Sequence, residues 1–591
     1  MTTRWRIQRH DNSAVGRLSS AAQISPIIAQ LLLGRGIEDV ESARCFLEPK
    51  LNDLRAPELL PGCTEAVDLL YDAVQQGKRI AVHGDYDVDG MTGTAILVGC
   101  FRMLGVDAQY VIPCRFNEGY GLSEDTLRRL AVDEGGDRTA DVVVTVDCGI
   151  GSVAEARLAR ELGLSLIITD HHEPGDELPD ADAIVHPRLP GTDYPMGGLS
   201  GSCVALKVAW GLLQKASGAK RVKPAMRDYL LRAVGMAAMG TVADVVPLLD
   251  ENRVLVTHGL RCILENPSPG LDALMRVAGL TDKKALSAED IGFQLSPRLN
   301  AVGRLEQARL GVDLLLTDRE ERAEELAQYI DQLNETRKTL QRRIERSAKQ
   351  QAETNYPDDD PALVLADQGW NQGIIGIVAG KLAESFKKPV IIISLDESGL
   401  QPGVGSARSV PGINLHEALG ECSDLLERHG GHAAAAGLAV RTRNLDAFRT
   451  AFYEAVERQA EKSDGAVPLE IDAEIPLAGL SLETVRHIER LGPFGEGNPR
   501  PIFCTGGVQL TEPPRTMGKG DLHLLIPLRQ GNNNKRAVAF FKAADWAEDL
   551  AAQGDRPIRI AFRAEINHFR GQQSVQLHLV DWQPEAGDDD A

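Results

Sequence analysis

From about residue 79, short apolar runs alternate with longer stretches of helical character. The runs RIAV, AQYVIP, DVVVTV and LSLIIT are separated by segments such as TGTAILVGCFRMLG and SVAEARLARELG. Strands and helices in this rhythm predict a parallel sheet covered by helices, and hence an α/β fold. In such sheets the loops after the strands meet at one edge, where ligands bind.

A charged stretch without Gly or Pro then runs from Asp318 to Ala352. As a helix it would span about 50 Å, which is enough to bridge two domains. Its apolar positions form a narrow stripe: Leu326, Ile330, Leu333, Leu340 and Ile344. One face should therefore pack while the rest is solvated. A connecting helix is the favoured interpretation, and a coiled-coil partner site is the alternative.

Two further patterns follow the predicted helix. A second α/β pattern begins at ALVLAD and continues through GIIGIVAGKLAESF and PVIIISL, which predicts a smaller domain. Beyond about residue 465 the runs IFCTGGVQL, LHLLIPL, AVAFF, IRIAFRAEI and SVQLHLVDW alternate with Gly-rich turns. Short strands of this kind predict a small closed barrel of the OB type, which is a common platform for single strands.

The 591 residues are too many for one core, and two to four domains are expected. We predict the following boundaries: an N-terminal helical segment over 1–60, the parallel-sheet domain over 61–317, the connecting helix over 318–354, the smaller α/β domain over 355–464, the barrel over 465–585, and an acidic tail over 586–591.

Composition is that of a globular protein, with 43% hydrophobic and 25% charged residues. We see no apolar run near 18 residues and no secretory h-region, so we expect no membrane association. The nine cysteines are scattered and contain no CxxC pair, which favours a reducing cytoplasm. The net charge of −21 argues against simple coating of nucleic acid. A local basic groove remains possible because salt screens charges beyond about 8 to 10 Å.

Acidic and histidine residues gather in the loops after the predicted strands. The set comprises His83, Asp85, Asp87, Asp89, Asp147, Asp170, His171 and His172, with Asp244 at the end of an apolar helix. Carboxylates and imidazoles without cysteine favour Mn²⁺ or Mg²⁺. The carboxylates exceed the needs of one ion, which predicts a two-ion site of the kind that hydrolyses phosphoesters. The alternative for any single aspartate is a helix cap.

These segments also carry a family resemblance. HGDYDVDG, VDCG, TDHHEP and GTVADVVPL resemble the ordered motifs of the DHH phosphoesterase superfamily, and GGHAAAAG resembles its DHHA1 motif. RFNEGYGL, FQLSPRLNAVGR, GWNQGIIGIVAGKL, GSARS and LGPFGEGNPRPIF narrow the resemblance to the RecJ single-strand exonucleases. It covers nearly the whole chain, so residues 61–317 resemble the DHH domain, 355–464 the DHHA1 domain and 465–585 the OB domain.

The resemblance implies roles for individual residues. His83, Asp87 and Asp147 would hold one ion, and Asp89, Asp147, His171 and Asp244 the other, with Asp147 as the bridge. Asp85 would have a supporting catalytic role, and His172 would donate a hydrogen bond to a phosphoryl oxygen. The strand and its 5′-phosphate would be gripped by Arg115, Arg298, Arg304, Ser406, Arg408 and His432. The alternative for a lone arginine is a solvated surface charge.

In the predicted barrel, Phe503, His523, Phe541 and Phe569 are candidates for base stacking, and Arg515, Lys519 and Arg570 for phosphate contacts. The alternative for the aromatic residues is a place in the core.

The resemblance implies a cytoplasmic, metal-dependent exonuclease that removes nucleotides from the 5′ end of single-stranded DNA in recombination and repair. It also implies a monomer whose partners are a single-strand-binding protein and a repair helicase. One alternative is a DHH phosphodiesterase that acts on small phosphates or short oligonucleotides, against which the extra barrel argues. Another is an inactive scaffold that binds single strands, which predicts that metal ligands are lost.

Overall fold

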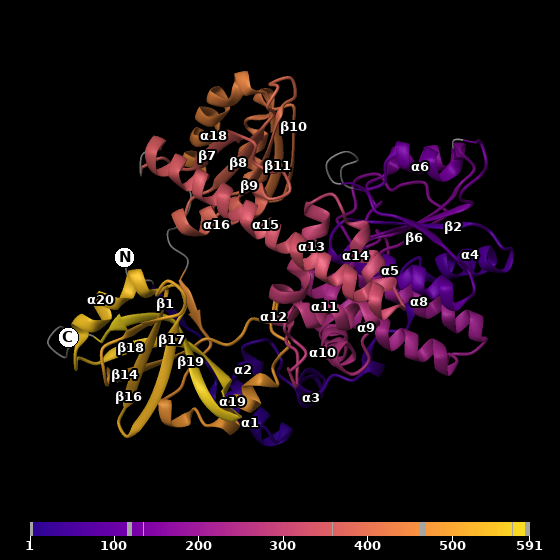
Figure 1. The fold of residues 1–591 in the computed structure, drawn as a ribbon. Helices are drawn as coiled ribbons and strands as arrows, with labels where there is room; N and C mark the ends of the chain where they lie inside the picture. Colours follow the sequence, from indigo (N-terminus) through magenta and orange to yellow (C-terminus); the bar gives the residue numbers. More distant parts are fainter. Residues whose placement is uncertain are drawn as a thin grey trace. The chain divides into compact units, whose positions relative to one another are not determined.

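The structure is a computed structural model that describes residues 4–114, 121–133, 135–356, 359–460, 468–569 and 571–585. The chain forms two compact units (Figure 1). The larger unit comprises Arg55–Val246 and His258–Gly465, and the smaller unit comprises Met1–Leu54, Pro247–Thr257 and Ala466–Ala591. Within the described ranges, no helix combines the length and apolar character needed to cross a bilayer.

Parallel strands form the first sheet of the larger unit, in the order β3-β2-β4-β5-β6. Their bounds are β2 (Ile80–Gly84), β3 (Gln109–Val111), β4 (Val142–Val146), β5 (Ser165–Thr169) and β6 (Ala183–Val185). Every residue of β2 and β4 is buried, as expected for a sheet that helices cover on both faces. The predicted parallel sheet is confirmed, and β6 is an addition to the predicted strands.

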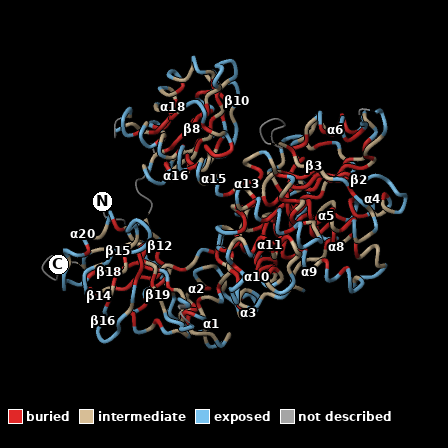
Figure 2. The backbone as a smooth tube through the Cα atoms, viewed as in Figure 1, coloured by how far each residue is buried: buried red, intermediate tan, exposed pale blue. Residues whose placement is uncertain are grey.

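Helices cover both faces of this sheet. α6 (Glu124–Ala131) and α7 (Val153–Glu161) share a core with the face that carries Val143. α5 (Val88–Met103) approaches Val146 on the opposite face and packs against α8 (Gly201–Ser217) and α9 (Pro224–Ala243). Figure 2 shows buried backbone concentrated around β2, α5 and α8. The remaining helices before the long one are α4 (Cys63–Gln75), α10 (Asp250–Glu265), α11 (Pro269–Val277), α12 (Ala288–Asp290), α13 (Ser296–Arg304) and α14 (Arg309–Leu316).

The predicted connecting helix is α15 (Glu320–Asn355), whose 36 residues span about 54 Å. Leu326 and Ile330 are buried in its first half, where it packs against α11, α13 and α14. Ile344 and Ala348 are buried in its second half, in a core that they share with β7 and β8. One apolar stripe therefore serves two successive cores, as a connecting helix requires.

The second sheet of the larger unit has the order β10-β11-β9-β8-β7. Its strands are β7 (Leu363–Gln368), β8 (Val390–Leu395), β9 (Gly403–Arg408), β10 (Arg428–Gly431) and β11 (Ala435–Val440). β7 and β8 are parallel, and the other pairs are antiparallel. The accompanying helices are α16 (Ile375–Phe386), α17 (Leu415–Gly420) and α18 (Leu445–Ala460). The smaller α/β domain is thus present as predicted.

A barrel forms most of the smaller unit. Its strands are β13 (Ala473–Glu474), β14 (Phe503–Leu510), β15 (Arg515–Met517), β16 (His523–Gln530), β17 (Asn533–Ala539), β18 (Ile558–Phe569) and β19 (Gln572–Pro584). Their order is β13-β14-β18-β19-β17-β16-β15, and β14 also pairs with β16. That pairing closes the ring and confirms the OB-type barrel, whose predicted runs correspond to β14, β16, β17, β18 and β19. The pattern missed α20 (Ala543–Gln553), between β17 and β18; α19 (Leu482–Glu489) precedes the ring.

The N-terminal segment packs into the same unit as the barrel. β1 (Trp5–Ile7) pairs in parallel with β12 (Leu469–Ile471). The helices α1 (Asn12–Ala22), α2 (Pro26–Leu33) and α3 (Val40–Leu47) share a hydrophobic core with barrel residues. The buried Arg253, near the start of α10, donates to the carbonyl oxygens of Phe46, Arg490, Leu491 and Gly492 at 2.7 to 3.3 Å. Segments distant in sequence therefore make one core.

Candidate active site

Candidate metal ligands from four elements converge at the carboxyl edge of the first sheet. Asp85, Asp87 and Asp89 follow β2, with Asp87 capping α5. The remaining contributors are Asp147 after β4, Asp170–His172 after β5, and Asp244 at the C-terminal end of α9. Adjacent parallel strands bring their loops together, as the strand order predicts.

The ligand atoms fall into overlapping groups, within each of which all atoms lie within 4.8 Å of one another. The groups are Asp85, Asp87 and Asp147; Asp89, His171 and Asp244; and Asp147, His171 and His172. The His171 Nε2 atom lies 3.0 Å from Asp147 Oδ1, 3.5 Å from Asp244 Oδ2 and 3.9 Å from Asp89 Oδ2. Asp147 and His171 therefore occupy the centre of the cluster.

The backbone around the cluster is shaped to hold these side chains. Asp147 has a φ of 63°, in the left-handed region that a non-glycine residue rarely adopts. Asp89 accepts hydrogen bonds from the backbone N–H groups of Gly201 (2.6 Å) and Ser202 (3.0 Å) at the start of α8. A Cβ atom at position 201 would lie 2.5 Å from Asp147 Oδ1, so only glycine fits there. The helix start thus approaches both carboxylates directly.

The carboxylates are buried close together, and their charges repel one another. Burial first, and then Asp89 and Asp87, raise the pKa of Asp147 well above its usual range. Burial and the charges of Asp89 and Asp87 also raise the pKa of Asp244 to about 8. Burial lowers the pKa of His171, which favours the neutral imidazole that metals bind. Cations would relieve this repulsion, and hard oxygen donors with one imidazole suit Mn²⁺ or Mg²⁺.

His172 is oriented by Asp170. The His172 Nδ1 atom lies 2.8 Å from Asp170 Oδ1, and the same carboxylate accepts from the backbone N–H groups of Ile150, His171 and His172. Burial acts to lower the pKa of His172, but the hydrogen bond and charge of Asp170 outweigh it, so the pKa is raised. The ring is about half exposed. It can therefore reach a substrate.

His83 and Asp85 do not lie where the roles implied by the resemblance would place them. His83 is fully buried in β2, and its Nε2 lies 3.2 Å from the carbonyl oxygen of Gly121. Among the described residues, His83 belongs to none of the metal-binding groups, whereas Asp85 lies with Asp87 and Asp147. The geometry favours Asp85 as the neighbour of Asp87 in the first group. The ligand role of His83 stays a prediction.

A cavity of about 630 Å³ lies beside this cluster within the larger unit. Its polar lining consists of Tyr86, Arg304, Gln372, Ser406, Arg408, Arg428 and His429. Tyr86 stands between the cluster residues Asp85 and Asp87. Arg304 donates to the carbonyl oxygen of Gly373 at 2.8 Å, and Arg408 donates to Ser406 Oγ at 3.1 Å. The structure thus brings together Arg304, Ser406 and Arg408 from the predicted set.

Of the other predicted strand-binding residues, Arg298 and His432 do not line this cavity. Arg298 is only 9% exposed and bonds to Asp331 at 2.9 Å and to the carbonyl oxygens of Gln294 and Val277. Those contacts give it a structural place between helices. His432 is exposed in the turn between β10 and β11. Arg115 lies outside the described residues.

Arg428 and His429 line the cavity but are not among the predicted strand contacts. They stand in the run RHGGH, in which only His432 is a predicted strand contact. β10 begins at Arg428, and that strand could have been recognised from its pairing partner GLAV. The local sequence gives no sign of which histidine faces the cavity.

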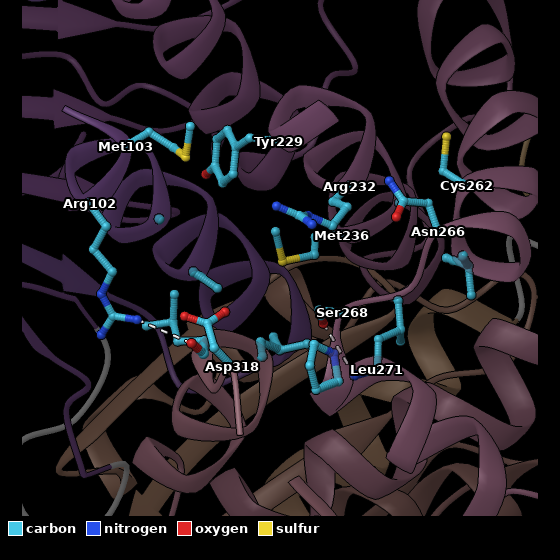
Figure 3. Close-up of a pocket in the computed structure, with 17 residues that line it drawn as sticks. Arg102, Met103, Tyr229, Arg232, Met236, Cys262, Asn266, Ser268, Leu271 and Asp318 are labelled. Atoms are coloured by element: carbon cyan, nitrogen blue, oxygen red, sulfur yellow. Dashed lines mark hydrogen bonds between the residues drawn. The ribbon is translucent and has the colours of Figure 1, made fainter. Parts of the chain in front are cut away.

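A separate cavity of about 150 Å³ lies among α5, α9, α10, α11 and α14 (Figure 3). Arg102, which donates to the carbonyl oxygen of Leu316 at 3.1 Å, lies at one end of its lining, and Cys262 lies at the other. Met103, Tyr229 and Met236 contribute apolar surface to its lining. Among the described residues, none of the predicted ligands or strand contacts lines it, so it is distinct from the active site.

In the barrel, the candidate stacking residues separate clearly. Phe503 is fully buried in the core, which is the alternative that the sequence left open for it. Phe541 is 72% exposed, and the ring of His523 lies 4.6 Å from it, edge to face. A groove of about 680 Å³ on the same barrel is lined by Arg515, Lys535 and Arg536 among others. Arg570 and the side chain of Phe569 lie outside the described residues.

Comparisons with known proteins match each part of the chain. Family models match the DHH family N-terminal domain at 79–235, the DHHA1 domain at 359–458 and the RecJ OB domain at 471–581. These stretches lie within the predicted domain ranges but do not test the boundaries.

Proteins named single-stranded-DNA-specific exonuclease RecJ are similar over most of the chain. The Bacillus subtilis protein is 38% identical over 98% of this chain and 70% of its own length, and the Salmonella typhimurium protein is 35% identical over 95% and 96%. The crystal structure of RecJ in complex with Mn²⁺ from Thermus thermophilus is 32% identical, covers 99% of this chain and 80% of that one, and gives a TM-score of 0.82. The resemblance seen in the motifs is confirmed: this chain belongs to the RecJ family.

Proposed function

We propose that this protein hydrolyses single-stranded DNA from its 5′ end and releases mononucleotides during recombination and repair. The observation that carries the proposal is the complete cluster of carboxylates and imidazoles at the sheet edge of a RecJ family chain. The inactive-scaffold alternative predicted lost ligands, whereas Asp89, Asp147, His171 and Asp244 are all present and close together.

The residues fit two divalent ions of the Mn²⁺ or Mg²⁺ type. We assign Asp87 and Asp147 to one ion, with Asp85 or His83 beside them, and Asp89, Asp147, His171 and Asp244 to the other. When bound, the ions supply the Lewis acidity that activates water and neutralises charge at the phosphodiester. Solved RecJ structures are described as complexes with Mn²⁺ and with Mg²⁺, which supports this choice of metal.

The chain's own groups position the substrate around this centre. Asp170 holds His172 by its Nδ1 atom and raises its pKa, so the protonated ring can donate from Nε2 to a phosphoryl oxygen. The carboxylate of Asp89, held by the backbone N–H groups at the start of α8, keeps its place without reorganisation during the reaction. His172 would therefore donate a hydrogen bond to the substrate, while the buried acids would bind the metal ions.

The cavity beside the metal cluster explains why the strand is cleaved from its 5′ end. Arg304, Arg408, Arg428 and His429 surround a polar space next to Tyr86, which stands between cluster residues. Arginines suit a terminal phosphate because the guanidinium pairs its oxygens bidentately. We place the 5′-phosphate there, so that the first phosphodiester lies at the metal cluster. The groups beside this cavity restrict cleavage to the first bond from the 5′ end.

The barrel adds affinity for the rest of the strand. Its groove carries Arg515 and Arg536, and Phe541 offers an exposed ring elsewhere in the same domain. Cations and exposed aromatic rings together are the usual platform for single strands. This domain also separates the protein from DHH phosphodiesterases of short oligonucleotides, which need no such extension.

We further propose a cytoplasmic monomer that works with a single-strand-binding protein and a repair helicase. A monomer is supported because a single chain supplies every residue of the metal-binding groups. A reducing compartment is supported because all nine cysteines are free thiols. The two partners are implied by family membership.

The test compares oligonucleotides labelled at the 5′ or 3′ end, in Mn²⁺ and in Mg²⁺. We expect labelled mononucleotide at once from the 5′ label, progressive shortening of the 3′-labelled strand, and no product in EDTA. Release of mononucleotide first from the 3′ label would reverse the polarity. Cleavage limited to very short oligonucleotides would favour the phosphodiesterase alternative.

A further inference from the structure

The segment after β6 contacts the backbone of the loop that carries His171 and His172. His186 is fully buried, and its Nε2 lies 2.7 Å from the carbonyl oxygen of His172. The Arg188 guanidinium donates to the carbonyl oxygen of His171 at 2.6 Å and also pairs with Glu173. Neither residue belongs to the metal-binding groups. Both reach the loop through its peptide bonds.

The two bonds of the His186 ring define its tautomer. A carbonyl oxygen can only accept a hydrogen bond. Nε2 of His186 must therefore carry a proton, which it donates in the hydrogen bond to the carbonyl oxygen of His172. The backbone N–H of Arg188 donates to Nδ1 at 2.9 Å, so Nδ1 carries no proton. His186 is therefore a neutral imidazole with both nitrogens engaged, which fixes the plane of the ring. The ring therefore links the end of β6 to the loop in a fixed orientation.

The loop is held from opposite sides. Asp170 accepts from the backbone N–H groups of His171 (2.7 Å) and His172 (3.2 Å), so it holds the N–H side of these peptides. His186 and Arg188 donate to the carbonyl oxygens of the same two residues. With both sides fixed, the loop backbone around His172 has little freedom to rotate.

We infer that His186 is a positioning residue that aims the His172 ring at the scissile phosphate, and that Arg188 does the same for His171 at the metal centre. This inference rests on the proposed function of His172 and His171. Outer groups of this kind orient ligands, and their loss typically costs 10- to 100-fold in activity or metal affinity. Because His186 holds the carbonyl group of His172 and Arg188 that of His171, we expect substitution of His186 to change kcat and substitution of Arg188 to change metal affinity.

A purely structural role would have a different signature. The backbone N–H of His186 also donates to the carbonyl oxygen of Pro61 at 3.3 Å, so the residue joins β6 to the segment before α4. If that were its whole purpose, side-chain changes would lower thermal stability and would affect kcat, KM and metal affinity together. Separating these quantities therefore distinguishes the roles.

Two substitutions at position 186 split the functions of the ring. Glutamine places an amide nitrogen as many bonds from Cα as Nε2 and can still donate to His172. Asparagine places its amide oxygen as many bonds from Cα as Nδ1 and retains only the acceptor for the Arg188 N–H. The exposed His416→Asn is a matched control on α17.

The experiment measures kcat and KM on a 5′-phosphorylated single strand, Mn²⁺ affinity by electron paramagnetic resonance, and thermal unfolding. We expect His186→Asn to lower kcat about 10- to 100-fold with KM and Mn²⁺ affinity unchanged, and His186→Gln to recover most of that loss. Arg188→Ala should weaken Mn²⁺ binding by about tenfold or more. His416→Asn should change none of these quantities.

Several outcomes would overturn the inference. Equal losses in the asparagine and glutamine variants would show that the bond to His172 is not what matters. Unchanged kcat in a folded His186→Asn would exclude positioning through that bond, and unchanged Mn²⁺ affinity in Arg188→Ala would exclude it for His171. If the wild-type protein fails to cleave DNA, the proposed function fails, while the Mn²⁺ affinities of the two variants still test the separate action of Arg188.

Discussion

At the scale of single residues, His171 shows how tightly the site is built. Its Nε2 atom lies 3.0 Å from one carboxylate and 3.5 Å from another, which belong to different metal-binding groups. The acids cannot all be charged at low cost in the absence of cations, because burial and mutual repulsion raise the pKa of Asp147 and Asp244. Metal binding therefore restores the charge balance that the fold disturbs.

Asp147→Asn should remove activity without loss of stability. We expect kcat to fall at least about a thousandfold, or about 4 kcal/mol, because the central ligand is lost. The pKa of Asp147 is higher in the folded protein, so its charge destabilises the metal-free fold at pH above the unfolded value of about 3.9. In EDTA at pH 7 the variant should unfold at the same or a higher temperature, and that difference should vanish as pH falls towards 4.

Activity assays in Mn²⁺ and thermal scans in EDTA over this pH range check the prediction. The exposed Asp107→Asn is the control and should match the wild type in both. An active Asp147→Asn, or one that melts well below the wild type, would contradict the central placement of this side chain.

Arg408→Ala should weaken the grip on the 5′ end. Arg408 lines the cavity with Ser406 and Arg304, where we place the terminal phosphate. We expect KM for 5′-phosphorylated strands to rise about tenfold with a smaller change in kcat, because the contact is made equally in the ground and transition states. Strands with a 5′-hydroxyl should show less effect.

Steady-state kinetics on matched phosphate and hydroxyl ends measure this, with the exposed Arg443→Ala as the control. Equal effects on both ends would move the phosphate site elsewhere. A loss confined to kcat would place Arg408 at the reacting phosphate.

Whether a site residue could be predicted from the sequence depends on the pattern of the residues around it. Most of the candidate metal ligands were predictable because they follow obvious buried strands, and parallel strands bring such loops together, whereas Asp244 ends the helix α9. The buried position of Arg298 was not predictable, because an arginine that binds Asp331 on another helix looks the same in sequence as one that faces DNA. His186 follows the three-residue β6, which is too short to give a clear strand pattern.

At the scale of elements, α10 illustrates how a buried arginine can join segments that are distant in sequence. The guanidinium of Arg253 stacks on the ring of Phe46 at 3.6 Å and donates to carbonyl oxygens on α3 and after α19. Burial lowers its pKa to about 9, so the group remains charged at neutral pH. Its hydrogen bonds compensate for the loss of water.

Arg253→Ala should therefore destabilise the smaller unit by about 3 kcal/mol or more, because buried carbonyl groups lose their donor and the ring of Phe46 loses its partner. Hydrogen exchange should become faster around residues 490–492 and in α3. The exposed Arg261→Ala on the same helix is the control and should leave exchange unchanged. Unaltered exchange in Arg253→Ala would show that the anchor contributes little.

Elements with strong periodicity were predicted, and those joined by distant contacts were not. The apolar stripe of α15 gave the connecting helix, and the alternating runs gave the barrel strands. The pairing of β1 with β12 links residues more than 460 positions apart, as in Trp5 with Leu469. Neither three-residue strand carries a sign of its partner, so the shared core of the N-terminal helices and the barrel could not be foreseen.

At the scale of the whole molecule, we propose that cleavage and retention of the strand belong to different units. The candidate metal cluster and the cavity lined by Arg304 and Arg408 lie in the larger unit, and the barrel lies in the smaller one. A short strand needs only the first, whereas a long strand can use both. The net charge of −21 means that affinity must come from local groups rather than from an overall positive field.

Phe541 is the barrel residue best placed to test this division. Its φ of 57° is strained for a bulky side chain, and its backbone N–H donates to His523 Nδ1 at 3.0 Å while its ring stays 72% exposed. A fold that holds an aromatic ring outward in this way favours a stacking role. Phe541→Ala should remove one base-stacking contact, worth about 1 to 3 kcal/mol.

We therefore expect the affinity of Phe541→Ala for a strand of about 30 nucleotides to fall roughly 5- to 160-fold, while cleavage of a strand of about four nucleotides is unchanged. The salt dependence of binding should keep its slope, because stacking releases no counterions. Fluorescence anisotropy at several salt concentrations, with a catalytically inactive background to prevent degradation, measures both. Leu400→Ala, whose side chain is similarly exposed at 77% in the larger unit, is the control. A flatter salt slope would mean that the substitution disturbs phosphate contacts instead, and equal losses on short and long strands would place Phe541 on the path to the active site.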